Sequence, residues 1–212
     1  MNANWTHDPG FMAILALTFA IGAGFIYGTL RNRRLQEHYL QVITPAILSY
    51  ARHPSARRLG TSGYHIIATN VRPPFKKIDV LIYLQPRELS VYWLFNLLRG
   101  RGDRVFIQMM LQRSPKVDVL AGPKVTPPSN SNLSWKQFPS PWEGPLFATK
   151  KLTAAQEDRL RALAQQMPDL EQLSIQHTSP HLNIITSANF LKSPKTAQNT
   201  FRALAQVAGA FL

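Results

Sequence analysis

The sequence predicts a single N-terminal transmembrane helix followed by a cytosolic α+β domain with a largely antiparallel sheet. Three observations lead to this prediction. The 212-residue chain has an uncharged, almost wholly apolar run at 11–30, and all 24 of its Lys and Arg residues follow that run. After it, segments of alternating hydrophobicity are joined by short turns. Segments of helical spacing lie among them, an order that is typical of helices packed on an antiparallel sheet.

The apolar run at 11–30 has the length and the flanks of a membrane span. Twenty helical residues cover about 30 Å, the thickness of one hydrocarbon core. A cleaved signal peptide fits less well, because no cation precedes the run and the run is longer than the usual stretch of about 7–15 residues. Arg31, Arg33 and Arg34 follow at once, so the positive-inside rule places the short N-terminus, 1–10, outside and the domain in the cytoplasm. The membrane is then the plasma membrane in a prokaryote and the endoplasmic reticulum in a eukaryote. An unusually apolar buried helix is the alternative.

One side of the predicted span carries only small residues. They recur at every fourth position, which lets a second helix approach closely: Ala16, Ala20, Gly24 and Gly28. We expect this side to bind another transmembrane protein. The alternative is that Gly and Ala are simply common in membrane helices.

The rest of the chain divides into a basic juxtamembrane helix and linker, 31–60, and the α+β domain, 61–212. Helical spacing of apolar residues continues past the span to Tyr50, and Pro45 is expected to kink or interrupt that helix. The stretch 52–63 is basic and rich in turn residues. Apolar runs then predict the following strands: Tyr64–Val71, Phe75–Leu84, Asp103–Gln112, Val117–Leu120, Leu146–Lys150, Leu173–His177 and Leu182–Phe190.

Three helices are expected within the domain. Thr153 and Gln156 form a capping box that opens the second of them, and Ser193 caps the last, with Pro194 at its first position. The first lies near residues 87–98. Its apolar side chains are expected to face inward: Leu89, Trp93, Leu94, Leu97 and Leu98.

The stretch 122–145 reads as a long loop. Its six prolines argue against regular structure. Its aromatic residues, Trp135, Phe138 and Trp142, argue against a free linker, and we expect them to pack on their own domain more readily than on a partner.

Composition and motifs argue against most enzyme and metal-site classes. The absence of cysteine excludes disulfides, a thiolate nucleophile and cysteine metal sites. P-loop, dinucleotide-binding and nucleophile-elbow motifs are missing. His177 and His181 have a metal-pair spacing only on a helix, which Pro180 interrupts. We predict no catalytic residue, no metal and no cofactor. Four carboxylates are candidates for an acid–base pair, and we expect them in structural ion pairs instead: Asp79, Glu88, Asp103 and Asp118.

The positive charge is concentrated in one part of the chain and predicts a surface that binds a polyanion. Residues 31–116 hold 15 basic and 4 acidic residues, a net charge of +11, against +3 for residues 117–212. The candidate residues are Arg31, Arg33, Arg34, Arg52, Arg57, Arg58, Lys76, Lys77, Arg99, Arg101 and Arg104. The first three suit anionic lipid headgroups. The turn 99–104 suits the phosphates of RNA, ribosomal RNA included, unless it is only a solvated turn.

Several short runs share their order and pattern with one known family. They are 84–89, which ends a strand and begins a helix, 97–99 and 103–107 around a basic turn, 146–151 before a helix, and 184–212 at the end. With the single span and the basic juxtamembrane helix, these runs resemble the calumin family. Its eukaryotic member is the coiled-coil subunit of the PAT complex, an endoplasmic-reticulum chaperone for multipass membrane proteins. The family's acidic lumenal region and its long basic coiled coil, which engages the ribosome, have no counterpart here. The chain would therefore be a remote, minimal homologue.

The resemblance implies a function that the residues alone do not specify. We expect a non-enzymatic factor in membrane-protein biogenesis that acts as a chaperone and docks on a ribosome or insertase through its basic cytosolic surface. The alternative is a structural accessory subunit of another membrane complex, whose basic face binds only anionic lipid.

Overall fold

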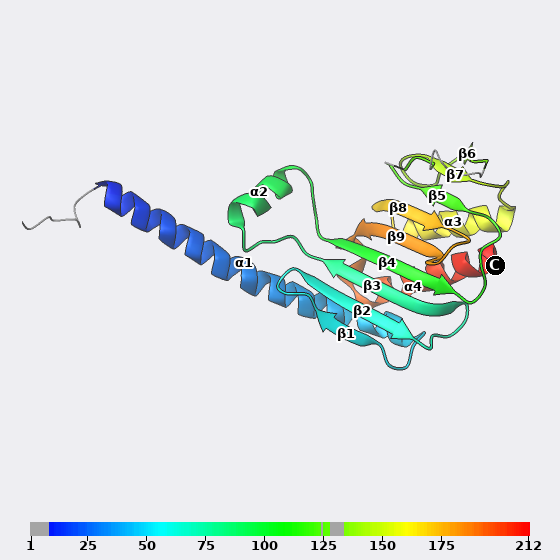
Figure 1. Cartoon of the computed structure of the whole chain (residues 1–212), viewed down its shortest axis with the longest axis horizontal. Coiled ribbons are helices and arrows are strands. Elements are labelled where there is room, and N and C mark those ends of the chain that lie inside the picture. Colours follow the sequence, from blue (N-terminus) through cyan, green and yellow to red (C-terminus); the bar gives the residue numbers. More distant parts are fainter. Residues whose placement is uncertain (1–8, 124, 128–133) are drawn as a thin grey trace, which may run out of the picture.

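The computed structural model describes residues 9–123, 125–127 and 134–212, in which a long helix projects from an α+β domain (Figure 1). The helix, α1, runs from Pro9 to Leu48 and is long and apolar enough to cross a membrane. The predicted external N-terminus, 1–10, lies outside the described residues except for its last two positions.

α1 is part of both the projecting segment and the domain. Its first half is exposed, whereas Val42, Ile43 and Ile47 are buried in the core of the domain. Pro45 lies inside the helix and does not interrupt it. The kink expected at this position stays a prediction. A proline removes one backbone hydrogen bond of a helix, and burial of the apolar side chains on either side of Pro45 compensates for that loss.

The described residues form one nine-stranded sheet in which all neighbouring strands are antiparallel (Figure 1). Its order is β1-β2-β3-β4-β9-β8-β5-β7-β6. This confirms the predicted α+β class and the antiparallel sheet. The strands are β1 (Ser55–Arg58), β2 (Gly63–Thr69), β3 (Phe75–Tyr83), β4 (Arg104–Leu111), β5 (Val119–Ala121), β6 (Lys136–Phe138), β7 (Leu146–Ala148), β8 (Leu170–Ile175) and β9 (Leu182–Ser187).

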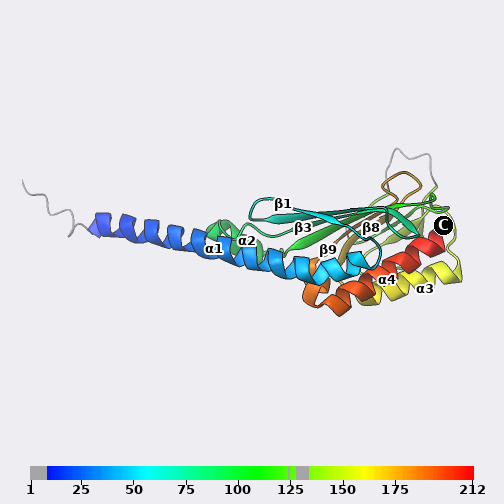
Figure 2. The same ribbon diagram turned by 90° about the horizontal axis from the view of Figure 1, so that it is seen from below.

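Three helices lie side by side on one face of the sheet (Figure 2). They are the second half of α1, α4 (Pro194–Phe211) and α3 (Ala154–Gln166). A short 3₁₀ helix, η2 (Ala188–Lys192), joins β9 to α4. The core lies between this helical layer and the sheet, and Phe75, Phe201 and Phe211 are among its fully buried side chains. Each such side chain contributes about 1.5–3 kcal/mol on leaving water, so packing between the helical layer and the sheet stabilises the domain.

The predicted helix caps are present. The Thr153 hydroxyl accepts a hydrogen bond from the Gln156 amide at 3.3 Å, and the Gln156 side chain accepts one from the Thr153 amide at 2.9 Å. The Ser193 hydroxyl accepts the Thr196 amide at 3.2 Å, with Pro194 at the start of α4. These caps satisfy amide groups that have no partner within the helix.

Two strands that the sequence did not predict occupy opposite edges of the sheet. β1 lies in the basic, turn-rich stretch and pairs with β2. β6 lies in the Pro-rich stretch and pairs with β7. The strand predicted at 117–120 is β5, which pairs with β7 and β8.

The described part of the Pro-rich stretch packs on its own domain, as expected. Trp142 is 7% exposed, and its indole N–H donates a hydrogen bond to the Met167 carbonyl at 3.1 Å. Phe138 is partly buried against the core. Positions 124 and 128–133 of this stretch lie outside the described residues.

Candidate functional site

The connection from β3 to β4 leaves the sheet and packs on α1 at Gly28 (Figure 1). A Cβ atom at this position would lie 2.2 Å from the Arg87 carbonyl oxygen and 2.5 Å from the Glu88 nitrogen. Only a glycine therefore allows the backbone of residues 87–88 to come this close to α1. The contact lies at the end of the apolar segment, 11–30.

A group of polar side chains, here called the junction, fixes this contact. Its members are Asn32, Gln85, Arg87, Glu88 and Asp103. The Asn32 amide nitrogen donates to the Gln85 carbonyl at 2.9 Å and to Glu88 Oε2 at 3.1 Å. Arg87 donates from one nitrogen to Asn32 Oδ1 at 2.9 Å and from another to Asp103 Oδ2 at 2.9 Å. Asn32 is fully buried. The junction therefore holds the β3–β4 connection rigidly against α1.

The ion pair between Arg87 and Asp103 is the electrostatic centre of the junction. Their side chains are only 12% and 7% exposed. Asp103 Oδ1 also accepts the Gln85 amide at 2.9 Å, and its other oxygen accepts the Tyr39 hydroxyl at 3.4 Å. Burial, and then the Asp103 charge, raise the pKa of Tyr39 to about 12. Both charges are thus paired in a poorly solvated site.

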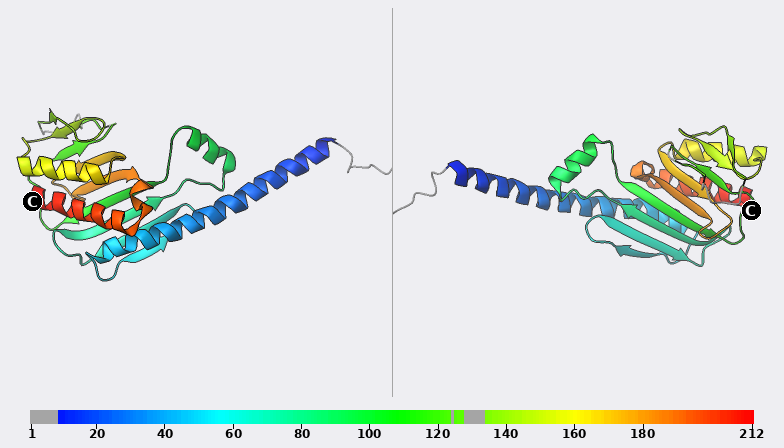
Figure 3. Two further views of the ribbon diagram at one scale, coloured as in Figure 1. Left: turned by 180° about the vertical axis from the view of Figure 1, so that it is seen from behind. Right: turned by 45° about the horizontal axis from the view of Figure 1, so that its top comes forward.

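The β3–β4 connection carries α2 (Ser90–Leu98), whose environment differs from the prediction. The side chains expected to face inward are exposed: Leu89, Leu94, Leu97 and Leu98; Trp93 is half-buried. The reason is topological. α2 lies beyond the end of the sheet and beside α1, where the helical layer and the sheet do not enclose it (Figure 3).

The four predicted small residues of α1 have different surroundings. Ala16 and Ala20 are exposed, Gly24 is half-buried and Gly28 is buried. The structure therefore places the last of them against the chain's own residues 87–88. The first two remain open on the surface of the apolar segment.

The eleven predicted cations occupy two ends of the domain and do not form one surface. Lys77 pairs with Thr69 and Met110, whereas Tyr83, six residues further along β3, pairs with Arg104. Six residues of strand separate these ends by about 20 Å. Arg31, Arg33, Arg34, Arg99, Arg101 and Arg104 lie at the end near α2, and Arg52, Lys76 and Lys77 lie at the other. Arg57 and Arg58 lie on the edge strand β1, where Arg58 pairs with Tyr64 and both arginines lie toward the end near α2.

Three of these cations form ion pairs on the surface. Arg58 pairs with Glu37 at 3.1 Å, Arg104 with Glu171 at 2.9 Å and Lys77 with Asp79 at 3.1 Å. Exposed pairs of this kind contribute about 0–1 kcal/mol.

Two more of the cations contact aromatic rings. The Arg31 guanidinium lies 5.8 Å from the ring centre of Trp93, and that of Arg99 lies 3.9 Å from the ring centre of Phe95. Within the described residues the following have no ion-pair partner and are exposed: Arg31, Arg33, Arg34, Arg52, Arg57, Lys76, Arg99 and Arg101.

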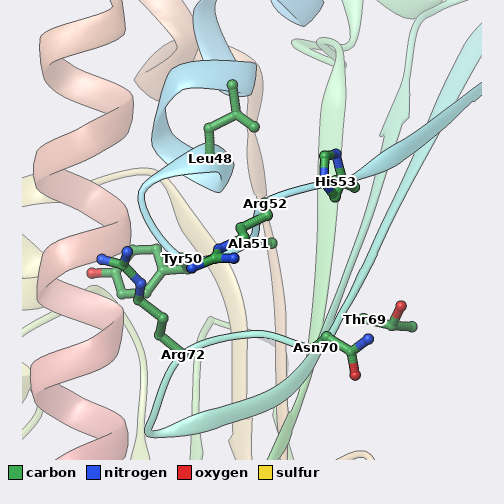
Figure 4. Close-up of a pocket in the computed structure, with 8 residues that line it drawn as sticks. All are labelled: Leu48, Tyr50, Ala51, Arg52, His53, Thr69, Asn70 and Arg72. Carbon is green, nitrogen blue, oxygen red and sulfur yellow. The ribbon is translucent and has the colours of Figure 1, made fainter.

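A pocket of about 390 Å³ opens at the C-terminal end of α1 (Figure 4). Its lining is Leu48, Tyr50, Ala51, Arg52, His53, Thr69, Asn70 and Arg72. None of these described lining residues is acidic. The side chains of Arg52 and Arg72 both extend toward the Tyr50 ring. Burial raises the pKa of Tyr50. Two converging guanidinium groups suit an anion, and this pocket lies at the end of the sheet opposite α2.

The carboxylates singled out in the sequence are all engaged. Asp79 accepts from His65 at 2.5 Å and from Lys77, and Asp118 lies 3.1 Å from the His177 ring. Glu88 accepts from the hydroxyls of Thr61 and Ser62 and from Asn32. Asp103 is paired with Arg87.

His177 and His181 do not face a common site. His177 contacts Asp118, whereas His181 Nδ1 accepts the Leu111 amide at 3.0 Å. Burial lowers the pKa of His181, so the neutral ring is favoured. Among the described residues, no group of three or more acidic or histidine side chains could hold a metal ion.

Sequence reasoning missed the polar side chains with which α1 enters the domain. Asn32 and Gln36 are both buried, and the Gln36 amide donates to the carbonyls of Gly60 and Gly63 at 3.2 Å. The signal was present, because Asn32 and Gln36 continue the four-residue spacing of Gly24 and Gly28. That spacing indicates one continuous covered side of the helix.

No protein-family model matches the chain, and no curated protein is detectably similar to it. The resemblance to the calumin family therefore stays a prediction.

Proposed function

We propose that this protein is a single-pass membrane protein whose non-enzymatic cytoplasmic domain serves membrane-protein biogenesis. In this proposal residues 11–30 of α1 cross the membrane with the N-terminus outside, and the domain docks on a ribosome or insertase. The exposed apolar surface of this segment and the arginines that follow it support the span and its orientation. The resemblance to the calumin family supports the same assignment.

One observation carries the proposal. The junction and the Gly28 contact hold the turn 99–104 beside the end of the apolar segment. Arg99 and Arg101 are exposed there and have no ion-pair partner within the described residues. Guanidinium groups on a glycine-containing turn suit phosphate oxygens of RNA. Within the apolar segment, the exposed Ala16 and Ala20 offer a surface to a partner helix.

The state of the carboxylates supports a non-enzymatic role. Asp103 and Asp118 are buried and are engaged by Arg87 and His177. A general acid or base needs a carboxylate that can reach a substrate proton. Because they are buried and paired, the Asp103 and Asp118 carboxylates are better suited to stabilising the fold than to proton transfer.

Ribosome binding can be tested by sedimentation of the full-length chain in detergent micelles with ribosomes at graded salt. The variant Arg99→Glu/Arg101→Glu should lower the slope of log K against log salt by about 2, roughly one for each lost phosphate contact. Arg104 is left unchanged because it pairs with Glu171. A matched control reverses Lys76 and Arg113, two exposed cations at the other end of the sheet. The docking proposal fails if the chain does not sediment with ribosomes at low salt, or if both variants lose binding equally.

A second function is favoured by a separate observation. Arg31, Arg33 and Arg34 fall within one helical turn after the apolar segment, and all three are exposed. Each cation at such a position contributes about 1 kcal/mol of attraction to anionic lipid. The protein would then be a structural accessory subunit of another membrane complex. Extraction in mild detergent separates the two, because recovery of a respiratory or transport complex without ribosome or insertase would favour the accessory role.

A further inference from the structure

α2 is an apolar helix that the described residues of the domain leave largely uncovered. Its residues are SVYWLFNLL, and none is charged. Val91 is 82% exposed and Leu98 is 79% exposed, while Tyr92, Leu94, Phe95 and Leu97 are each about half exposed. A helix that is apolar on most sides belongs inside a protein or a lipid phase. Nine residues are also too few to keep an isolated helix folded in water. α2 therefore requires a cover.

The position of α2 indicates which cover it has. Trp93 contacts Arg31, and the backbone of Arg87, three residues before α2 begins, packs on Gly28. α2 therefore lies where the apolar segment of α1 ends. Two views show it beside α1, beyond the end of the sheet (Figures 1 and 3). At the same level α1 exposes Ile26 and Leu30. These two side chains project away from the Gly28 contact, so a membrane that covers them would reach the level of α2.

The flanks and the length of α2 are those of an interfacial helix. It ends at Arg99, with Arg101 two residues further, and both are exposed. Trp93 and Tyr92 are of the type that settles at the boundary between headgroups and acyl chains. Nine helical residues extend for only about 14 Å, which is less than half of a hydrocarbon core. α2 is too short to cross a membrane but long enough to lie in its boundary.

We propose that α2 lies in the cytoplasmic leaflet of the membrane, where lipid covers its apolar side chains. The domain then has two membrane contacts, α1 and α2, fixed to each other by the junction. Lipid is favoured over a protein partner because the exposed side chains of α2 spread over most of its circumference. At about 100° per residue, Tyr92 and Leu97 project about 140° apart across the narrow side of the helix. Exposed side chains fill the wide side between them: Val91, Leu94, Phe95 and Leu98. A partner helix covers one side of α2 only. This inference rests on the proposed membrane span of α1.

The chain has no cysteine, so one introduced cysteine carries an environment-sensitive fluorophore at a single position. We would label Leu94→Cys and, separately, Leu98→Cys in the full-length protein, reconstituted into vesicles of neutral and anionic phospholipid. Ile14→Cys in the apolar segment is the positive control, and Gln112→Cys at the far end of the sheet is the negative control. The readouts are the emission maximum, quenching by nitroxide lipids and quenching by aqueous iodide.

Both α2 labels should emit at shorter wavelength than the Gln112 label, should be quenched by nitroxides near the headgroups and should be protected from iodide. α2 labels that behave like the Gln112 label, while the Ile14 label is quenched by lipid, would overturn the inference and leave the span intact. α2 labels protected from both quenchers would also overturn it, because a protein would then be the cover. Failure of the Ile14 label to meet lipid would refute the span itself, and with it the proposed function.

Discussion

Replacing Gly28 by alanine tests the close contact between α1 and residues 87–88. The added Cβ atom would lie 2.2 Å from the Arg87 carbonyl oxygen and 2.3 Å from its carbon. Both are backbone atoms, so the β3–β4 connection has to move by more than about 1 Å to restore an ordinary separation near 3.5 Å. That movement pulls against the hydrogen bonds between Asn32 and its partners.

The size of the effect follows from the cost of overpacking, about 1–3 kcal/mol. Alanine also favours the helical state of α1 by up to about 1 kcal/mol. This gain does not offset the cost, because α1 stays helical whether or not residues 85–104 are docked on it. The open state of that segment should therefore rise about 5- to 140-fold, at 1.4 kcal/mol for each factor of ten.

Hydrogen exchange of the full-length protein in lipid nanodiscs measures this opening directly. Amides of α2 and of the turn after it, such as the Arg101 amide bonded to the Asn96 carbonyl, should exchange faster in Gly28→Ala, while β8 and β9 stay protected. Gly22→Ala is the matched control, because no atom of the described residues lies within 4 Å of its added Cβ. Unchanged exchange in residues 85–104, or an equal increase in the control, would refute the reasoning.

Three further predictions concern the domain, each measured by urea unfolding of the full-length chain in detergent. Arg87→Met leaves the buried Asp103 carboxylate without its cation, so the free energy of unfolding should fall by about 3–5 kcal/mol. The double variant Arg87→Met/Asp103→Asn should regain most of this loss. An Arg87→Met variant as stable as the original chain would contradict the role assigned to the ion pair. Burial lowers the pKa of His181, so the unfolded chain takes up the proton first. The contribution of His181 to the free energy of unfolding should be full above about pH 6.5 and fall as the pH drops toward the lowered pKa of the folded state. His181→Gln should flatten this part of the dependence of stability on pH. If the substitution leaves that dependence unaltered, His181 is not its cause. Thr153→Ala removes the capping box of α3 and should cost about 1 kcal/mol, and an undiminished midpoint would show that the cap is dispensable.

The elements that could be predicted are those with local signals. β2, β3 and β4 follow from alternation, and both helix caps follow from a few neighbouring residues. β1 and β6 could not be found in this way, because each is a short edge strand that exists only through pairing with its neighbour. Their sequences, SARR and KQF, carry no alternation of their own.

The sequence predicted the helix and the cations of the candidate site, but it did not predict which residues contact one another. The apolar pattern of residues 89–98 correctly indicated a helix, but the pattern alone does not say whether an apolar side faces a core or an external cover. The partners of Asn32 lie 53 and 56 residues further along the chain. No local rule connects such distant residues. For the same reason, the cations of residues 31–104 looked like one surface in the sequence, although the register of β3 separates them.

The unbroken course of α1 affects how the domain is presented to other molecules. A tethered domain samples many orientations and loses that freedom when it binds. Here one helix, about 60 Å long in all, contains both the apolar segment and core residues such as Ile43 and Ile47, with no flexible link between them. Anchor and domain therefore turn together. One residue inserted between Ala16 and the domain would therefore rotate Ala16 by about 100° relative to the sheet. The small-residue side of the helix would then face a different direction.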